Sequence, residues 1–272
     1  LDFVKNYGET NKTSATSAWK DLGPYSADSI TTGYNPGIGR VETFYVDPTN
    51  ESKIYLGSRA GGFWKSLDSG ATWVNTTDFL IATGVQSIAA SPTNSDSVLI
   101  ALRNAINGTT HGIYRSTNGG DTWDSTLFTP NNLGWGGLGT SDKIRTVKIS
   151  PHNSNLIIIG STKGLYVSTD NLLTWSQKST GDFEAIAFHP TDSNYIYAKE
   201  RSTSGVLLVS SNGGSTFANS GFISANLVSD SYLSTSGGSP NSLYIASGMG
   251  VWVSHDKGAT FSSLNSIPKS IR

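Results

Sequence analysis

The stretch Gly61-Gly-Phe-Trp-Lys-Ser-Leu-Asp-Ser-Gly-Ala-Thr-Trp73 decides the fold, because its second half recurs along the chain. This half, called the kernel here, reads Ser66-x-Asp68-x-Gly70-x-Thr72-Trp73 in its first copy. Four more copies begin at Ser116, Ser168, Ser210 and Ser254, so successive kernels lie 50, 52, 42 and 44 residues apart. A repeat of about 40 to 50 residues in a chain rich in strand-forming residues predicts the blades of a β-propeller.

Each kernel is expected to form a tight turn between two strands. The residues before it are β-branched or aromatic and favour a strand. The Asp or Asn side chain can accept hydrogen bonds from N–H groups of its own turn, and glycine adopts backbone angles that other residues resist. The closing Trp or Phe supplies a large ring to bury between blades. We therefore interpret the following residues as structural clips and not as catalytic groups: Asp68, Asn118, Asp170, Asn212 and Asp256.

The kernel resembles the Asp box, or bacterial neuraminidase repeat, of sialidases, sortilin-type receptors, photosystem assembly factors and xyloglucan-active glycosidases. The resemblance implies a propeller but no particular activity, because these families share the box and not the chemistry. The third copy departs from the pattern, since Leu172 stands where glycine is expected. This substitution predicts a distorted third turn.

The predicted fold class is an all-β propeller of five four-stranded antiparallel blades. Two strands joined by a proline-containing turn precede each kernel hairpin and its returning strand, which together make one blade. The blades are expected at about residues 39–80, 81–130, 143–180, 182–222 and 225–265, within a propeller domain of residues 17–272. Residues 1–16 are interpreted as an N-terminal strap. Residues 17–24, with Trp19, match the returning strand of a further blade, which leaves open a larger propeller.

Composition argues against several classes of function. The net charge of −1 gives no electrostatic case for binding nucleic acid. No run of 18 apolar residues is present, so membrane insertion is not expected. The chain has no cysteine, and its four histidines show no metal-binding spacing. We predict neither a metal site nor a cofactor.

Two further segments carry a second resemblance. Trp19-Lys-Asp-Leu-Gly-Pro24 and Gly37-Ile-Gly-Arg-Val41 are similar to the blade starts of Asp-box propellers in secreted or surface proteins of Bacteroidota-like bacteria. The resemblance implies a bacterial protein that is secreted or held at the cell surface. It also implies further domains in a longer parent chain.

The binding face is expected opposite the kernels, where two insertions, 103–111 and 127–142, lengthen the loops. Trp135 lies between glycines there, where its ring could stack on a sugar or clamp the loop. The near-neutral charge predicts a polar, uncharged partner such as a glycan, and another surface protein is the other candidate. The candidate ligand-binding residues are Arg59, Arg103, His111, Trp135, Arg145 and Arg201.

The leading interpretation is a non-catalytic binding or scaffolding propeller, with glycan as the candidate ligand and no catalytic residue assigned. The alternative is a sialidase- or xyloglucanase-like glycoside hydrolase, or an inactive remnant of one, with Glu42 and Glu184 as candidate carboxylates. The segment from Gly37-Ile-Gly-Arg-Val41 through Tyr55-Leu-Gly-Ser-Arg-Ala-Gly-Gly62 resembles the opening blade of xyloglucan-active glycosidases, whose catalytic Asp precedes the second glycine of the pair by three residues. Arg59 stands at that position, and an arginine cannot act as general acid or base at neutral pH. The Arg-Ile-Pro motif of sialidases is absent.

Overall fold

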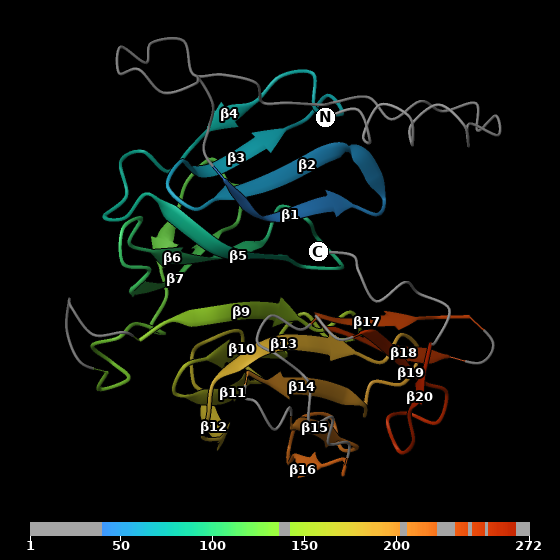
Figure 1. Cartoon of the computed structure of the whole chain (residues 1–272). Coiled ribbons are helices and arrows are strands. Elements are labelled where there is room, and N and C mark those ends of the chain that lie inside the picture. The colour runs from blue at the N-terminus through green and yellow to red at the C-terminus, as the bar shows by residue number, and fades with distance from the viewer. Residues whose placement is uncertain are drawn as a thin grey trace, which may run out of the picture.

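The computed structural model describes residues 40–135, 142–201, 206–221, 232–238, 241–247 and 250–264. These residues form five four-stranded antiparallel sheets and no helix, and the sheets are the blades of a β-propeller. Figure 1 shows the blades following one another around a common centre. The predicted fold class is confirmed. The strap of residues 1–16 and the extra strand of residues 17–24 lie outside the described residues.

The strands follow chain order within each blade. Blade one contains β1 (Val41–Asp47), β2 (Asn50–Ser58), β3 (Gly62–Ser66) and β4 (Val74–Asn75). Blade two contains β5 (Gly84–Ala90), β6 (Val98–Arg103), β7 (Thr110–Ser116) and β8 (Asp124–Ser125). Blade three contains β9 (Ile144–Ile149), β10 (Ile157–Ser161), β11 (Gly164–Ser168) and β12 (Ser176–Ser179). Blade four contains β13 (Phe183–Phe188), β14 (Ile196–Glu200), β15 (Leu207–Ser210) and β16 (Ala218–Asn219). Blade five contains β17 (Tyr232–Ser236), β18 (Ser242–Ser247), β19 (Gly250–Ser254) and β20 (Ser262–Ser263).

The first strand of each blade lies innermost. Strand β1 packs beside β5, β5 beside β9, β9 beside β13, and β13 beside β17. The second and third strands lie further out, and the short fourth strand forms the rim (Figure 1). The side chains of the first strands therefore meet around the centre of the molecule, which is where a ligand site can draw on several blades at once.

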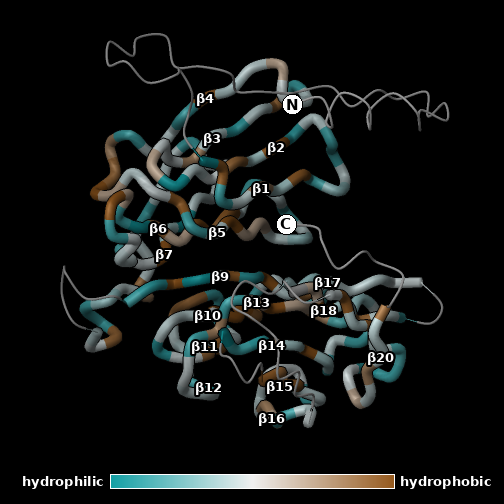
Figure 2. Tube along the Cα trace, in the orientation of Figure 1, coloured by the Kyte–Doolittle hydropathy of each residue, from teal (hydrophilic) through white to brown (hydrophobic). Residues whose placement is uncertain are grey.

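Apolar clusters between consecutive blades hold the propeller together. The cluster between blades one and two joins Tyr55 and Phe63 to Val85 and Ile100, and three similar clusters join the later pairs. Figure 2 shows hydrophobic segments along the strands, while many turns are hydrophilic. Each fully buried Ile, Val or Phe contributes about 1.5–3 kcal/mol relative to an exposed side chain. The core of this protein is thus divided among the interfaces between blades.

The outer flank of blade one differs from the flanks of later blades. Phe44 on β1 is 70% exposed, whereas Ile88 in the equivalent position of β5 is 5% exposed. The equivalent residues Val147 and Ile186 are also buried. In blades two to four this position packs against the preceding blade, and in blade one the described residues place no such blade beside it.

The kernels form turns with one shared set of hydrogen bonds. In the first, the Ser66 hydroxyl donates to Asp68 Oδ1 at 2.7 Å and accepts from the Gly70 N–H at 2.8 Å. Asp68 Oδ1 also accepts from the Thr72 N–H at 2.8 Å. The other four turns repeat these three bonds, with Asn118 and Asn212 in the role of the aspartate in blades two and four. Each kernel Asp or Asn thus holds its own turn.

The prediction of a distorted third turn is wrong. The Leu172 N–H donates to Ser168 Oγ at 2.9 Å, as the kernel glycines do, and Leu172 adopts the same left-handed conformation with φ of 65°. That conformation costs a non-glycine residue about 1–2 kcal/mol. The Leu172 side chain is buried between blades two and three, and burial of a leucine contributes about 1.5–3 kcal/mol. Packing therefore offsets the backbone strain.

The ring that closes a kernel packs on the preceding blade. Trp123 meets Phe63 of blade one edge to face, with ring centroids 4.9 Å apart. Its indole N–H donates to the Thr76 hydroxyl at 3.2 Å. A Cβ on Gly120 would lie 2.5 Å from the Phe63 ring, so this turn has no room for a side chain there. Kernels therefore join neighbouring blades as well as neighbouring strands.

Candidate functional site

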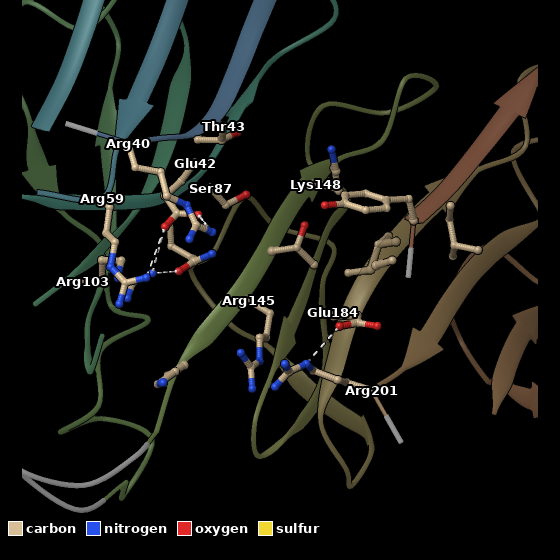
Figure 3. A pocket seen from close by; sticks show the side chains of 17 residues that line it. Arg40, Glu42, Thr43, Arg59, Ser87, Arg103, Arg145, Lys148, Glu184 and Arg201 are labelled. Carbon is tan, nitrogen blue, oxygen red and sulfur yellow. Dashed lines mark hydrogen bonds and ion pairs between the residues drawn. The ribbon is translucent and has the colours of Figure 1, made fainter. Parts of the chain in front are cut away.

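A cavity of about 540 Å³ opens at the centre, where the first strands begin (Figure 3). Antiparallel pairing brings the start of each first strand beside the end of the second strand, as the bond from the Arg59 N–H to the Arg40 carbonyl shows. The kernel turns lie at the other end of the same strands. In the first kernel, the Ser69 N–H donates to the carbonyl of Ser52, which is near the start of β2. The volume falls in the usual range of ligand pockets, about 300–1,000 Å³.

The cavity wall is strongly cationic although the chain as a whole carries a net charge of −1. Two carboxylates line it, Glu42 and Glu184. The positively charged lining residues are Arg40, Arg59, Arg103, Lys143, Arg145, Lys148 and Arg201. Uncharged polar groups, among them Gln86 and Thr146, complete the wall. The overall charge therefore does not reveal the local excess of cations at this cavity, to which all five described blades contribute lining residues.

Glu42 of β1 lies among three arginines. Its side chain is 8% exposed, and Oε2 accepts from the Arg40 guanidinium at 3.2 Å. Arg103 NH1 lies 3.7 Å from Oε1, and Arg59 NH1 lies 3.9 Å from the same oxygen. One carboxylate thus serves as the shared counter-charge of three guanidinium groups from two blades (Figure 3).

Arg103 is held in a slot made by glycines. A Cβ on Gly84 would lie 2.6 Å from Arg103 Cγ, and one on Gly108 would lie 2.5 Å from its terminal nitrogen NH2. The guanidinium donates to Gln86 Oε1, and its Nε is buried with no hydrogen-bond partner among the described residues. Burial lowers the pKa of Arg103, and the nearby Arg59 lowers it further against the opposing effect of Glu42. The fold therefore fixes a buried cation beside other cations.

On the opposite wall, Arg145 and Arg201 belong to blades three and four. The Arg145 guanidinium donates two parallel bonds to Asp182, at 2.9 and 2.7 Å. Glu184 lies between Arg201, at 3.2 Å, and the fully buried Lys199, at 3.6 Å. Such bidentate and paired contacts fix the orientation of the arginine side chains before any ligand arrives.

Lys143 stands directly before β9 and lines the cavity. Among the residues that the structure describes, no carboxylate forms an ion pair with its ammonium group. Burial lowers the pKa of Lys143, and four arginines lower it further, beginning with Arg145 and Arg103. The Lys143 ammonium therefore lies within the field of the arginine cluster.

Four of the six residues predicted to bind ligand line the cavity: Arg59, Arg103, Arg145 and Arg201. His111 on β7 does not; its Nε2 is buried without a hydrogen-bond partner among the described residues, and burial lowers its pKa. Gln86 also lines the cavity and was not predicted to do so. Aligning the repeats on the turn prolines would have found it, because Glu42, Gln86, Arg145 and Glu184 all stand six residues before that proline.

Trp135 belongs to the apolar core, so its ring faces protein side chains. Its side chain is 8% exposed and packs against Phe128 and Tyr166, with centroids 6.2 and 6.0 Å away. The indole also forms a side-chain hydrogen bond with Tyr166. This placement agrees with the second possibility left open by the sequence, a clamp on the loop that leads into blade three.

Comparison with known proteins places relatives of this chain among glycoside hydrolases. A xyloglucanase of Paenibacillus sp is 33% identical over 109 residues, which cover 34% of this chain and 11% of the relative. A xyloglucanase of Hypocrea jecorina is 32% identical over 145 residues, which cover 53% and 14%. The chain thus spans only a small part of these relatives. No protein-family model matches the sequence.

Solved structures of similar fold are β-propellers. The GH74 xyloglucanase of Xanthomonas campestris has a TM-score of 0.64 and 19% identity, covering 85% of this chain and 38% of the other. The extracellular domain of a one-component system from B. thetaiotaomicron has a TM-score of 0.59 and 14% identity, covering 86% and 28%. An auxiliary nutrient binding protein of Bacteroides thetaiotaomicron has a TM-score of 0.56 and 14% identity, covering 83% and 57%. In the described part of our chain, no helix could cross a bilayer.

Proposed function

We propose that this protein is a non-catalytic propeller that binds a glycan at the central cavity. The observation that carries the proposal is the state of the two carboxylates in the cavity wall, because each is engaged by cations of the protein itself. The relatives named as xyloglucanases support a glycan as the ligand class. The size of the cavity and the contributions of five blades to its wall support a binding role.

Glycoside hydrolysis requires two carboxyl groups, one of which donates a proton to the leaving oxygen. Glu42 is shared by three arginines, and Glu184 lies between Lys199 and Arg201. Both carboxylates are therefore placed to neutralise protein cations and orient them. Arg59 occupies the position at which the family resemblance leads one to expect the catalytic aspartate, and it lines the same cavity.

The proposal includes the setting of the propeller. We propose that the kernel turns are Asp boxes, that the protein is exported to the surface or medium of a bacterium, and that it belongs to a longer parent chain. The shared hydrogen bonds of the five turns support the first point. The likeness to an extracellular domain and to a nutrient binding protein supports the second. The small share of each xyloglucanase that the chain spans supports the third.

A binding array combined with a hydrolysis assay tests the proposed function. The protein is applied to immobilised plant and bacterial glycans, and the same glycans are incubated with it and analysed for released oligosaccharides. We expect retention on at least one glycan and no release above the background of heat-denatured protein. Retention on none of the glycans would contradict the proposal.

A glycoside hydrolase remains the second candidate, favoured by the relatives that are named as xyloglucanases. It requires Glu42 and Glu184 to act across the cavity that both of them line. Release of oligosaccharides by the native protein, abolished in Glu42→Gln or Glu184→Gln, would establish it. Release that survives both substitutions would point to a contaminating enzyme.

We also propose that a further blade of the parent chain covers the outer flank of blade one. The exposure of Phe44, against the burial of Ile88 at the equivalent position, supports this. Because the chain has no cysteine, Phe44→Cys introduces one thiol that a maleimide probe can report. We expect protection of Cys at this position in the parent protein but not in the present chain. The exposed loop variant Ile106→Cys is the control and should react equally in both.

A further inference from the structure

The cations of the cavity occupy equivalent positions of successive repeats. Arg59, Arg103 and Arg201 each directly follow the second-strand residue that pairs with an equivalent first-strand residue, which is Val41, Val85 or Phe183. Arg40 and Lys143 share a second position, immediately before the first strand, and each accepts a bond at its carbonyl from the residue opposite. Because the repeats place equivalent residues around one centre, these cations converge on a single opening.

Among the described residues, the cations at the cavity outnumber the carboxylates. Glu42 forms ion pairs with three arginines. Asp182 pairs with Arg145, and Glu184 pairs with Arg201 and Lys199. If the neighbours Asp182 and Lys199 are added to the lining residues, eight cations face three carboxylates. Packing like charges into a partly enclosed site is unfavourable unless an opposite charge joins them. The described wall of the cavity therefore carries an excess of positive charge, which an anionic ligand would neutralise.

The protein nevertheless holds these cations in fixed positions. Gly84 and Gly108 leave room for Arg103, Gln86 orients it, and the Asp182 carboxylate orients Arg145 through two bonds. Guanidinium groups fixed in this way match the two oxygens of a carboxylate or sulfate group. Burial lowers the pKa of Arg103 and of Lys143, and repulsion from neighbouring arginines lowers each pKa further. An anionic group would relieve that repulsion.

We propose that the central cavity binds an acidic glycan, and that carboxylate or sulfate groups on its sugars are held by Arg59, Arg103 and Lys143. The glycan part of this inference rests on the proposed function. The acidic part rests on the cation cluster alone, and it differs from the uncharged ligand that the net charge of the chain predicts. Oligosaccharides of xyloglucan are uncharged and lack the groups that these side chains recognise.

Calorimetric titration of the purified protein with four probes tests the inference. The probes are a galacturonic acid oligomer, a sulfated heparin tetrasaccharide, a neutral xyloglucan oligosaccharide and polyglutamate, each at low and at high sodium chloride. We expect at least one acidic oligosaccharide to bind at least tenfold more tightly than the neutral one. Its affinity should fall at high salt, because ions screen the attraction between exposed charges. The two acidic sugars distinguish carboxylate from sulfate.

Variants locate the binding site. Arg59 and Lys143 are less buried than Arg103, so Arg59→Gln and Lys143→Gln should leave the fold intact, which the melting temperature checks. We expect each to weaken binding of the acidic oligosaccharide severalfold, and the double variant at least tenfold. Lys257→Gln removes one cation from a kernel turn at the other face, and it should leave binding unchanged.

The outcomes separate this inference from the proposed function. Equal or tighter binding of the neutral oligosaccharide, insensitive to salt, would overturn the acidic ligand and leave the glycan-binding function standing. Binding of polyglutamate alone would overturn both, since the partner would then be an acidic protein segment. Undiminished binding by the double variant would overturn the placement of the acidic groups in the cavity.

Discussion

The two faces of the propeller use the same repeat in opposite ways. On the kernel face, five turns keep the same serine, the same Asp or Asn and the same three hydrogen bonds. On the cavity face, equivalent positions differ from blade to blade, as with Glu42, Gln86, Arg145 and Glu184. A residue type that is the same in every blade is needed for each blade to fold. Residues that differ between blades can instead be used to recognise a ligand. We therefore assign the stability of the fold to the kernel face and the selectivity for a ligand to the cavity face.

The largest effect is expected on the kernel side, at the ring that joins two blades. Trp123→Ala removes a ring that packs on Phe63, and we expect it to lower the free energy of unfolding by about 3–5 kcal/mol. Urea unfolding followed by circular dichroism measures this. Trp73, whose ring is only partly buried, is the matched control. Trp73→Ala should lower the free energy of unfolding by less than Trp123→Ala does. An equal loss in both variants would contradict the role assigned to the preceding blade.

A similar loss is expected for Trp135→Ala, although Trp135 lies in an insertion on the cavity side. Its ring fills the core between blades two and three, so we expect a loss of about 3–5 kcal/mol in unfolding free energy. Any change in ligand affinity should be confined to conditions in which the fold is lost. Weaker binding at an unchanged melting temperature would show that the ring contacts ligand after all.

A smaller effect is expected when one kernel loses its central hydroxyl. Ser66→Ala leaves the buried N–H of Gly70 without an acceptor, which should cost about 1–3 kcal/mol of unfolding free energy. Ser69 lies in the same turn but is exposed, so Ser69→Ala is the control and should change the free energy of unfolding very little. Equal stability of the two variants would mean that the hydrogen bonds of the turn contribute little.

The smallest effect is a dependence of stability on acid. Hydrogen bonds from Thr72 and Thr260 hold the pKa of Asp68 and Asp256 at about 2, below the ordinary 3.8. The stability that these bonds provide is thus complete above about pH 4 and lost as the pH falls towards about 2. The triple variant Asp68→Asn, Asp170→Asn and Asp256→Asn keeps the clip in the form of Asn118 and Asn212. Its melting temperature should therefore fall less steeply between pH 4 and pH 2 than that of the native protein.

The fold could be predicted from the sequence because each repeat contains the residues that form its own turns. The two strands expected on either side of a turn proline are present in the first four blades as β1 and β2, β5 and β6, β9 and β10, and β13 and β14. The third turn was mispredicted because the burial of Leu172 depends on a neighbouring blade, which local sequence does not reveal. Four arginines of the site could be found from their place in the repeat, whereas their convergence with Lys143 and Gln86 depends on the ring.

A structure of the protein in complex with an acidic oligosaccharide tests the division between the two faces most directly. We expect the sugar to occupy the central cavity, with an acidic group beside Arg59, Arg103 and Lys143, and the kernel turns to be unchanged from the free protein. An oligosaccharide bound at the kernel turns or on the rim of the blades, with the cavity left unoccupied, would contradict this division.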